Sequence, residues 1–205
     1  WDVKKIKHVS TKIGSGITPK GGADVYQTSG IPLLRSQNIH FTGLKLEDVA
    51  YITQEIHESM SNSEVFEGDV LLNITGASIG RCYYAKKIIL PANVNQHVCI
   101  IRPNGDIITE YLYFILSSFL GQFQIEYCQN GANREGLNFE QLKNFNIPLP
   151  PISEQNKIIV NTNSQIIKID KAIILTEKEI SLIEEYRTAL INEAVTGKIK
   201  VTESV

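Results

Sequence analysis

The sequence NIPLPPISEQNKII, residues 146–159, marks a point where one kind of structure has to end and another begin. Proline lacks a backbone N–H and restricts the residue before it, so Leu149 and Pro150 are predicted to be extended and a sheet cannot easily continue through the proline pair. Ser153 suits a helix N-cap, and Glu154 places a negative charge near the positive end of the helix dipole. The stretch predicts a domain boundary, with a folded unit ending near Leu149 and a helix beginning near Ser153.

After this boundary, apolar residues recur at alternating steps of three and four, which is the a/d spacing of a coiled coil. The predicted seam consists of Ile159, Thr162, Ile166, Ile169, Ile173, Thr176, Ile180, Ile183, Arg187, Leu190 and Ala194. Ile158, Ile167 and Ile174 widen the stripe. A helix over residues 153–195 would be about 65 Å long, and it cannot bury its own stripe, so it needs a partner helix. Gly197 follows the last periodic residue and suits the C′ position.

The alternative is a helix broken at residues 161–163 into two shorter helices that pack on the first domain. Under the long-helix interpretation, the polar seam residues Thr162, Thr176 and Arg187 would help to fix the register at some cost in stability.

The composition is that of an ordinary globular protein, with 205 residues, 42% hydrophobic residues and a formal net charge of −2. The longest apolar segment, residues 111–123, is shorter than the roughly 18 residues that suggest a membrane-spanning helix. We see no signal-peptide pattern, and because the chain starts at Trp1 we expect a fragment of a longer protein. Cys82, Cys99 and Cys128 form no C-x-x-C pair, which argues against disulfides or zinc and fits a reducing cytoplasm.

Residues 1–150 consist of short apolar runs separated by Gly, Pro, Asn and Ser, which predicts an α+β domain rich in sheet or built as an open barrel. We expect strands in residues 3–10, 31–39, 68–76, 80–90 and 96–103, a polar loop over 11–22, a helix over 108–128, and a short helix followed by a strand over 138–149.

The global charge does not indicate a nucleic-acid partner, because residues 1–150 hold 13 Lys and Arg against 14 Asp and Glu. A DNA-binding interpretation therefore depends on local clusters. Loop glycines let backbone N–H groups approach phosphates, Arg can pair with guanine, and Gln or Asn can pair with adenine. The candidate DNA contacts are Lys12, Ser15, Thr18, Lys20, Arg35, Gln37, Asn38, Ser78, Arg81, Asn133 and Arg134. The competing interpretation for each loop is a solvated turn.

No pattern in the sequence indicates catalysis. There is no G-x-x-x-x-G-K-[ST], no G-x-G-x-x-G after a strand and no G-x-S-x-G. The histidines His8, His40, His57 and His97 are scattered without metal-ligand spacing, and we interpret them as surface or ordinary packed residues. We therefore expect a non-catalytic protein with no metal and no cofactor.

Several segments together resemble the specificity subunit of type I restriction–modification systems. They follow the family's order and cover nearly the whole chain: WDVKKIKHV, GITPKGG, IPLLRSQNI, FEGDVLLNITGASIGR, NVNQHVCIIRP, NREGLNFEQLKNFNIPLPPISEQNKII and LINEAVTGKIKV. The resemblance implies a target recognition domain at 1–150 that reads one half of a split double-stranded DNA site. It also implies a long coiled-coil helix at 151–196, which pairs antiparallel with a second helix and docks methyltransferase subunits, and a tail at 197–205. Such subunits direct both modification and restriction subunits.

The chain departs from this family in one respect, since a full-length specificity subunit resembles two such units in tandem. It could be the C-terminal half of a longer subunit, or a natural or engineered half-subunit. In either case we expect a homodimer with antiparallel helices, whose two recognition domains would read a palindromic split site.

Two other functional classes remain open at this stage. One is a protein–protein adaptor with a β-rich domain on a coiled-coil stalk, which the balanced charge favours slightly. The other is a small hydrolase or nuclease with a coiled-coil tail, which lacks support from any carboxylate cluster or nucleophile motif.

Overall fold

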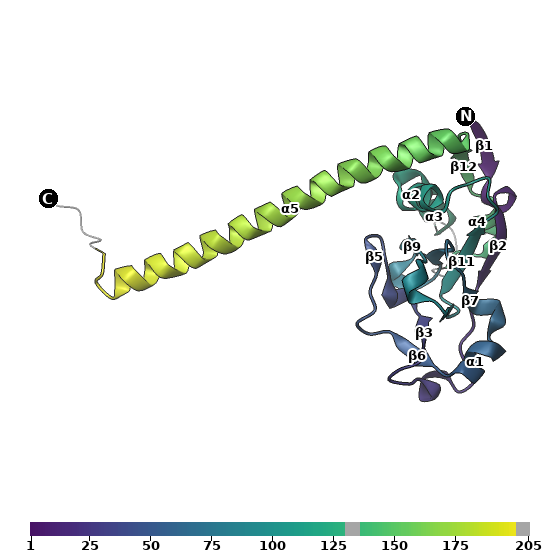
Figure 1. The fold of residues 1–205 in the computed structure, drawn as a ribbon, viewed down its shortest axis with the longest axis horizontal. Coiled ribbons are helices and arrows are strands. Elements are labelled where there is room, and N and C mark those ends of the chain that lie inside the picture. The colour runs from purple at the N-terminus through teal and green to yellow at the C-terminus, as the bar shows by residue number, and fades with distance from the viewer. Residues whose placement is uncertain (130–135, 200–205) are drawn as a thin grey trace. The chain divides into compact units, whose positions relative to one another are not determined.

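The computed structural model describes residues 1–129 and 136–199. Its internal contacts separate the chain into two compact units, one ending at Ile158 and the other beginning at Ile159. The first unit is a mixed α+β domain with two four-stranded sheets, and the second continues the long helix α5 (Figure 1). The expected α+β class, with a long helix after the globular domain, is confirmed.

The first sheet has the order β2-β11-β8-β9 and is antiparallel throughout. Its strands are β2 (Ser10–Ser15), β8 (Val70–Asn73), β9 (Cys82–Tyr84) and β11 (Val98–Pro103). The central strand β11 is fully buried over its first four residues. Because neighbouring strands run in opposite directions, β2 and β8 end at the same end of the sheet at which β9 and β11 begin.

The second sheet has the order β6-β3-β10-β7, formed by β3 (Ile31–Leu34), β6 (Ala50–Ile52), β7 (Glu64–Val65) and β10 (Ala92–Val94). Within it, β3 and β10 are parallel. Leucine, isoleucine and valine side chains from both sheets share one buried cluster, in which Leu34 and Val94 meet Leu71 and Ile100. The two sheets therefore pack around a common core.

Gly16, just after β2, lies where this strand leaves the first sheet and passes β10. A Cβ atom built on it would lie 1.7 Å from the carbonyl oxygen of Val94, so no side chain fits there. The glycine lets the loop after β2 approach the end of β10 in the second sheet.

The observed secondary structure differs from the predicted segments in two places near the N-terminus. The expected strand over 3–10 is β1 (Asp2–Lys5) followed by a turn at Ile6–His8, and the expected loop over 11–22 begins as β2. Strand β2 was missed because it lies at the edge of its sheet, where half-exposed polar residues resemble a loop. The hairpin strands β4 (Ile39–His40) and β5 (Gly43–Leu44) and helix α1 (Gln54–Ser59) complete this region.

The single helix predicted over 108–128 is two helices, α2 (Thr109–Ser117) and α3 (Phe119–Gln129). Ser118 is extended between them, and its hydroxyl donates to the carbonyl of Ile115. A Cβ on Gly121 would lie 2.5 Å from that same carbonyl oxygen, so glycine is what allows the sharp turn. The apolar pattern continues across the break because α2 and α3 pack against each other, which hides the break from a periodicity argument.

The end of the domain follows the sequence prediction closely. Asn138 caps α4 (Phe139–Lys143) in a capping box with Gln141, and β12 (Asn146–Leu149) follows. Strand β12 pairs antiparallel with β1, so that Asp2 lies opposite Leu149. The first and last strands of the domain thus close on each other before the prolines.

Helix α5 (Ile152–Val195) is continuous, so the broken-helix alternative is wrong. Its first turn differs from the prediction, because the N–H of Gln155 donates to the carbonyl of Pro151. Pro151 therefore holds the cap position and Ser153 lies inside the first turn, so the predicted N-cap is wrong by two residues. A proline suits the helix start because it has no N–H to leave unpaired.

Gln155 is a buried polar residue that fixes the start of α5. Its Oε1 accepts from the N–H of Ile108 at 2.8 Å, and its Nε2 donates to the carbonyls of Asp106 and Pro150. At the other end of the helix, Gly197 has φ of +71°, its N–H donates to Ala194, and the N–H of Lys198 donates to Glu193. This is the Schellman arrangement, which confirms the predicted C′ glycine.

The half-buried Arg102 and the buried Asp69 form an ion pair that joins β11 to the turn before β8. Arg102 Nε lies 2.7 Å from Oδ1 of Asp69, and Nη2 lies 2.8 Å from Oδ2, while Asp69 is fully buried. Oδ2 also accepts from the N–H of Phe66, and the guanidinium lies 3.8 Å from the centre of the Phe66 ring. Hydrogen bonding to Asp69 raises the pKa of Arg102.

We expect Arg102→Leu to lower the free energy of unfolding by about 3 kcal/mol, because it leaves the Asp69 carboxylate buried without its partner. Urea denaturation of the chain measures this. Lys143→Leu is the control, since its ion pair with Glu140 is exposed and contributes at most about 1 kcal/mol. Equal effects of the two substitutions would contradict the assignment of a structural role to the buried pair.

Candidate nucleic-acid interface

Loops from both sheets meet at the end of the first sheet where β2 and β8 terminate. A cleft of about 460 Å³ opens there, and the turn after β3, the β8–β9 connection and the residue before β11 line it. The lining residues are Ser36, Gln37, Thr75, Gly76, Ala77, Ser78, Arg81 and His97. Most of these residues have polar side chains, and Arg81 is the one Lys or Arg among them.

Asn73 holds two walls of the cleft together from beneath. This last residue of β8 is fully buried, and its Nδ2 donates to the carbonyl of Ser36 at 2.8 Å and to Oγ of Ser78 at 3.1 Å. The backbone of Asn73 also pairs with Arg81 and Gly80 across the β8–β9 connection. One buried amide thus fixes the position of both turns.

A chain of side-chain hydrogen bonds crosses the floor of this region. The hydroxyl of Thr18 donates to Oε1 of Gln96 at 2.5 Å, Nε2 of Gln96 lies 3.0 Å from Nε2 of His97, and Nδ1 of His97 lies 2.6 Å from Oγ1 of Thr75. The chain joins the loop after β2 to the β8–β9 connection through the residues that precede β11.

Some of the predicted DNA contacts come together here. Gln37, Ser78 and Arg81 line the cleft, and Thr18 reaches it through Gln96. Lys20 is exposed on the same loop as Thr18. Ser15 ends β2, and its hydroxyl donates to the carbonyl of Gly16.

Lys12 and Arg35 are held by contacts within the domain. Nζ of Lys12 donates to the carbonyl of Asn62 at 2.7 Å, and burial, followed by the nearby charge of Arg102, lowers the pKa of this lysine. Arg35 donates from Nη2 to the carbonyl of Asp48 at 2.9 Å, and its guanidinium lies over the ring of Tyr26.

Asn38 requires a correction. It is 1% exposed, its Oδ1 accepts from the N–H of Arg35, and its Nδ2 donates to the carbonyl of Lys45. Its amide is therefore fully used in shaping the turn and is withdrawn from the DNA contacts. Asn133 and Arg134 lie outside the residues that the structure describes.

Three further residues line the cleft and are not among the predicted DNA contacts: Ser36, Thr75 and His97. His97 was interpreted as an ordinary histidine. A backbone hydrogen bond from Ile74 to the carbonyl of His97 brings it beside Thr75, although 22 positions separate the two. No local pattern reports such a long-range contact, and only the position of Thr75 beside a loop glycine offered a signal.

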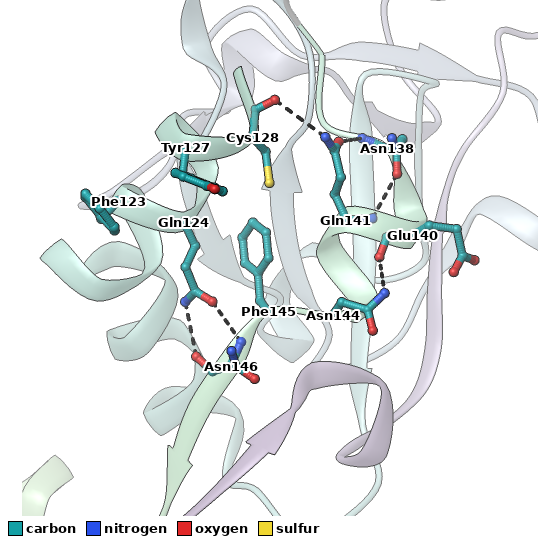
Figure 2. Close-up of a pocket in the computed structure, with 10 residues that line it drawn as sticks. All are labelled: Phe123, Gln124, Tyr127, Cys128, Asn138, Glu140, Gln141, Asn144, Phe145 and Asn146. Atoms are coloured by element: carbon teal, nitrogen blue, oxygen red, sulfur yellow. Dashed lines mark hydrogen bonds between the residues drawn. The ribbon is translucent and has the colours of Figure 1, made fainter. Parts of the chain in front are cut away.

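A second cavity, of about 650 Å³, lies between α3 and α4 (Figure 2). Figure 2 shows Phe145 between the two helices, with Phe123 and Tyr127 on α3. Its amides are occupied with nearby backbone groups: Gln124 bonds both the N–H and the carbonyl of Asn146, and Gln141 bonds the N–H of Asn138. This cavity therefore offers aromatic surface and lacks the basic lining of a DNA contact.

Over residues 1–129 and 136–199, no three His, Cys, Asp or Glu side chains gather in a way that could hold a metal ion. Within the same ranges, no helix combines the length and the apolar character needed to cross a membrane.

Comparison with known protein families identifies the class of protein to which this chain belongs. Residues 1–185 match the family model of the type I restriction modification DNA specificity domain. This match covers more than half of the chain, and the chain belongs to that family.

Individual relatives agree with this assignment. The chain is 34% identical over 131 residues to the type I restriction enzyme EcoBI specificity subunit of Escherichia coli, covering 63% of this chain and 27% of the relative. It is 26% identical over 205 residues to the MjaVIII specificity subunit of Methanocaldococcus jannaschii, covering 98% of this chain and 47% of the relative. The chain therefore spans less than half the length of these curated relatives.

Solved structures share the fold. The HsdS subunit from Thermoanaerobacter tengcongensis matches with a TM-score of 0.61 at 19% identity, over 97% of this chain and 46% of that chain. A chain from work on assembly and conformational transition of the type I R-M system matches with a TM-score of 0.68, also at 19% identity, over 95% of this chain and 45% of that chain.

The neighbours Gln37 and Asn38 should behave in opposite ways. We expect Asn38→Ala to lower the free energy of unfolding by about 2 kcal/mol, because it leaves buried backbone groups unpaired. Gln37→Ala should change it by less than about 0.5 kcal/mol, because Gln37 is exposed. Urea denaturation of both variants measures this, and a stable Asn38→Ala variant would restore Asn38 as a candidate contact.

Proposed function

We propose that this chain is the DNA-reading part of a type I restriction–modification specificity subunit and binds one half of a split double-stranded DNA site. The observation that carries the proposal is the family match, which extends over both the cleft-bearing domain and most of α5. The cleft at the end of the sheet, lined mainly by residues with polar side chains, would be the surface on which such reading takes place.

The chemistry of the cleft suits recognition of base edges. Arg81 can donate two hydrogen bonds to guanine, and Gln37 can form a bidentate pair with adenine. Lys20 and the loop N–H groups would contact phosphates and set the register. With a balanced global charge, this local cation arrangement would have to supply the electrostatic part of binding.

The long helix is proposed to pair antiparallel with a second copy. Its seam side chains Ile169, Ile173, Ile180 and Ile183 are 49–59% exposed in the single chain, and a stripe of that kind is costly to leave in water. Ile159, the first predicted seam residue, is only 7% exposed and is thus already buried in the single chain. Two such chains would hold two reading domains apart at a spacing set by the helices, as the half-site spacing of dimeric DNA readers is set by dimer geometry.

A second apolar stripe on α5 is proposed to dock the methyltransferase subunits. Val160, Ile167 and Ile174 each follow a seam residue by one position, which places them about 100° round the helix. Leu175 and Leu182 extend this stripe, and all five side chains are more than half exposed. The restriction subunits would join the assembly formed on this core.

Removing the Arg81 cation tests DNA reading by the cleft. We expect Arg81→Met to weaken binding to the chain's selected duplex by about 1–3 kcal/mol and to relax one base position if Arg81 reads a base. If Arg81 contacts a phosphate, the loss would be uniform across sequences and the salt dependence of binding would flatten.

Fluorescence anisotropy across a salt series measures both. The control is Lys143→Met, which removes one positive charge outside the cleft, and equal binding by both variants would remove Arg81 from the interface. Salt-independent binding of the unmodified chain would favour a protein–protein adaptor.

Charge placed on the two stripes of α5 should separate their roles. We expect Ile173→Glu to convert a dimer at micromolar concentration into a monomer in analytical ultracentrifugation, because it buries a carboxylate in the seam. Ile167→Glu should leave the dimer intact and weaken capture of the methyltransferase subunit.

Ser164→Glu is the control for the dimer alone, because position 164 is exposed on the side of the helix away from the seam and lies beside Val160 and Ile167 of the second stripe. A monomer before any substitution would contradict the homodimer. Dimer loss in the Ser164→Glu variant as well would show a general effect of charge.

A further inference from the structure

The donor and acceptor in each hydrogen bond between Thr18 and Thr75 can be assigned, starting from the amide of Gln96. Oε1 of this amide accepts the hydroxyl of Thr18, so its Nε2 faces the imidazole of His97 at 3.0 Å. With the Gln96 amide in this orientation, its Nε2 donates and Nε2 of His97 accepts.

The direction continues through the imidazole. A neutral histidine whose Nε2 accepts carries its hydrogen on Nδ1. Nδ1 of His97 lies 2.6 Å from Oγ1 of Thr75, so His97 donates and the Thr75 oxygen accepts. The backbone N–H of His97 donates to Oδ1 of Asn95, a buried side chain, which holds the histidine in place.

The hydroxyl hydrogen of Thr75 is left without a use inside the described part of the domain. Thr75 lines the cleft, and its contact with His97 occupies the oxygen and not the hydrogen. The β-bridge between Thr75 and Gly136 fixes the backbone at this position. The hydroxyl hydrogen of Thr75 is therefore available to a hydrogen-bond acceptor in the cleft.

We propose that Thr75 is a specificity-determining residue that donates a hydrogen bond to an acceptor of the bound DNA, with His97 and Gln96 as positioning residues that fix this polarity. The inference rests on the proposed function. The acceptors that fit are purine N7, guanine O6, thymine O4 and a phosphate oxygen.

The first test needs no DNA. In ¹⁵N NMR spectra of the full chain at neutral pH, the ring of His97 should show the tautomer protonated at Nδ1. His97→Asn identifies the resonance by its loss. A ring protonated at Nε2 would overturn the inference, because Thr75 would then donate to His97.

The second test uses the duplex that the full chain enriches from a random library. We expect Thr75→Val, which removes the hydroxyl at almost constant shape, to weaken binding roughly tenfold, the loss of one hydrogen bond. Thr75→Ser keeps the donor and should bind within about twofold of the unmodified chain. The conservative His97→Asn, which keeps an N–H for Thr75, should bind better than His97→Leu.

Analogue duplexes locate the acceptor. Purine N7 is removed by 7-deazapurines, guanine O6 by 2-aminopurine, thymine O4 by 5-methyl-2-pyrimidinone, and the charged phosphate oxygens by methylphosphonates. One such replacement should weaken the unmodified chain and leave Thr75→Val unaffected, and the class of that analogue distinguishes a base edge from a phosphate.

Two outcomes would count against the inference in different ways. Equal binding of a specific duplex by the unmodified chain and Thr75→Val, or a loss that no single analogue abolishes, would overturn the role of Thr75 and leave the proposed function standing. Failure of the unmodified chain to enrich any duplex would overturn the proposed function and this inference with it.

Discussion

The antiparallel pairing of β11 with both β2 and β8 is the constraint on which the rest of the domain depends. A central strand with two antiparallel neighbours brings loops that are distant in the sequence to one end of the sheet. The parallel pair of β3 and β10 adds its own turns there, because Asn95 after β10 hydrogen-bonds the last residue of β3. The candidate interface exists because these strand ends coincide.

Buried amides then determine the shape of that end of the sheet. Asn73 joins the turn after β3 to the β8–β9 connection, Asn38 shapes the first of these turns, and Gln155 performs the same task at the start of α5. A buried amide is costly unless its donor and acceptor groups are matched, and Asn38 and Gln155 pair both groups, whereas Asn73 pairs its Nδ2 and its Oδ1 has no hydrogen-bond partner among the described residues. Each of these contacts therefore restricts the backbone to one arrangement, and the exposed side chains beside it can take part in recognition.

The helix α5 poses a different physical problem. Its apolar residues are spread over two stripes and remain largely exposed over Ile166–Val195 in the single chain, whereas the globular domain buries a complete core of its own. A hydrophobic surface of this extent is typical of an element completed by other chains. The globular domain buries its hydrophobic core within one chain, whereas the apolar side chains of α5 stay exposed in the single chain.

By itself, the sequence determined the features that depend on local chemistry. The proline pair ended the sheet, the three–four periodicity gave a continuous helix, and Gly197 ended it, since each of these acts within a few residues. The α+β class and the short helix and strand before the prolines were predictable for the same reason. The motif order also allowed the family to be suggested.

Only the tertiary structure decided which loop residues share a surface. Gln37, Ser78 and Arg81 meet in the cleft, Asn38 turns inward, and Lys12 is bound elsewhere in the domain. Strand β2 was hidden because its residues at the edge of the sheet are polar and half exposed, and the break before α3 was hidden because the apolar pattern continues across it. The hydrogen-bond chain that ends at Thr75 joins three segments, which are the loop after β2, the residues before β11 and the β8–β9 connection. Such contacts are made by the packing of strands, and neighbours in the sequence do not specify them.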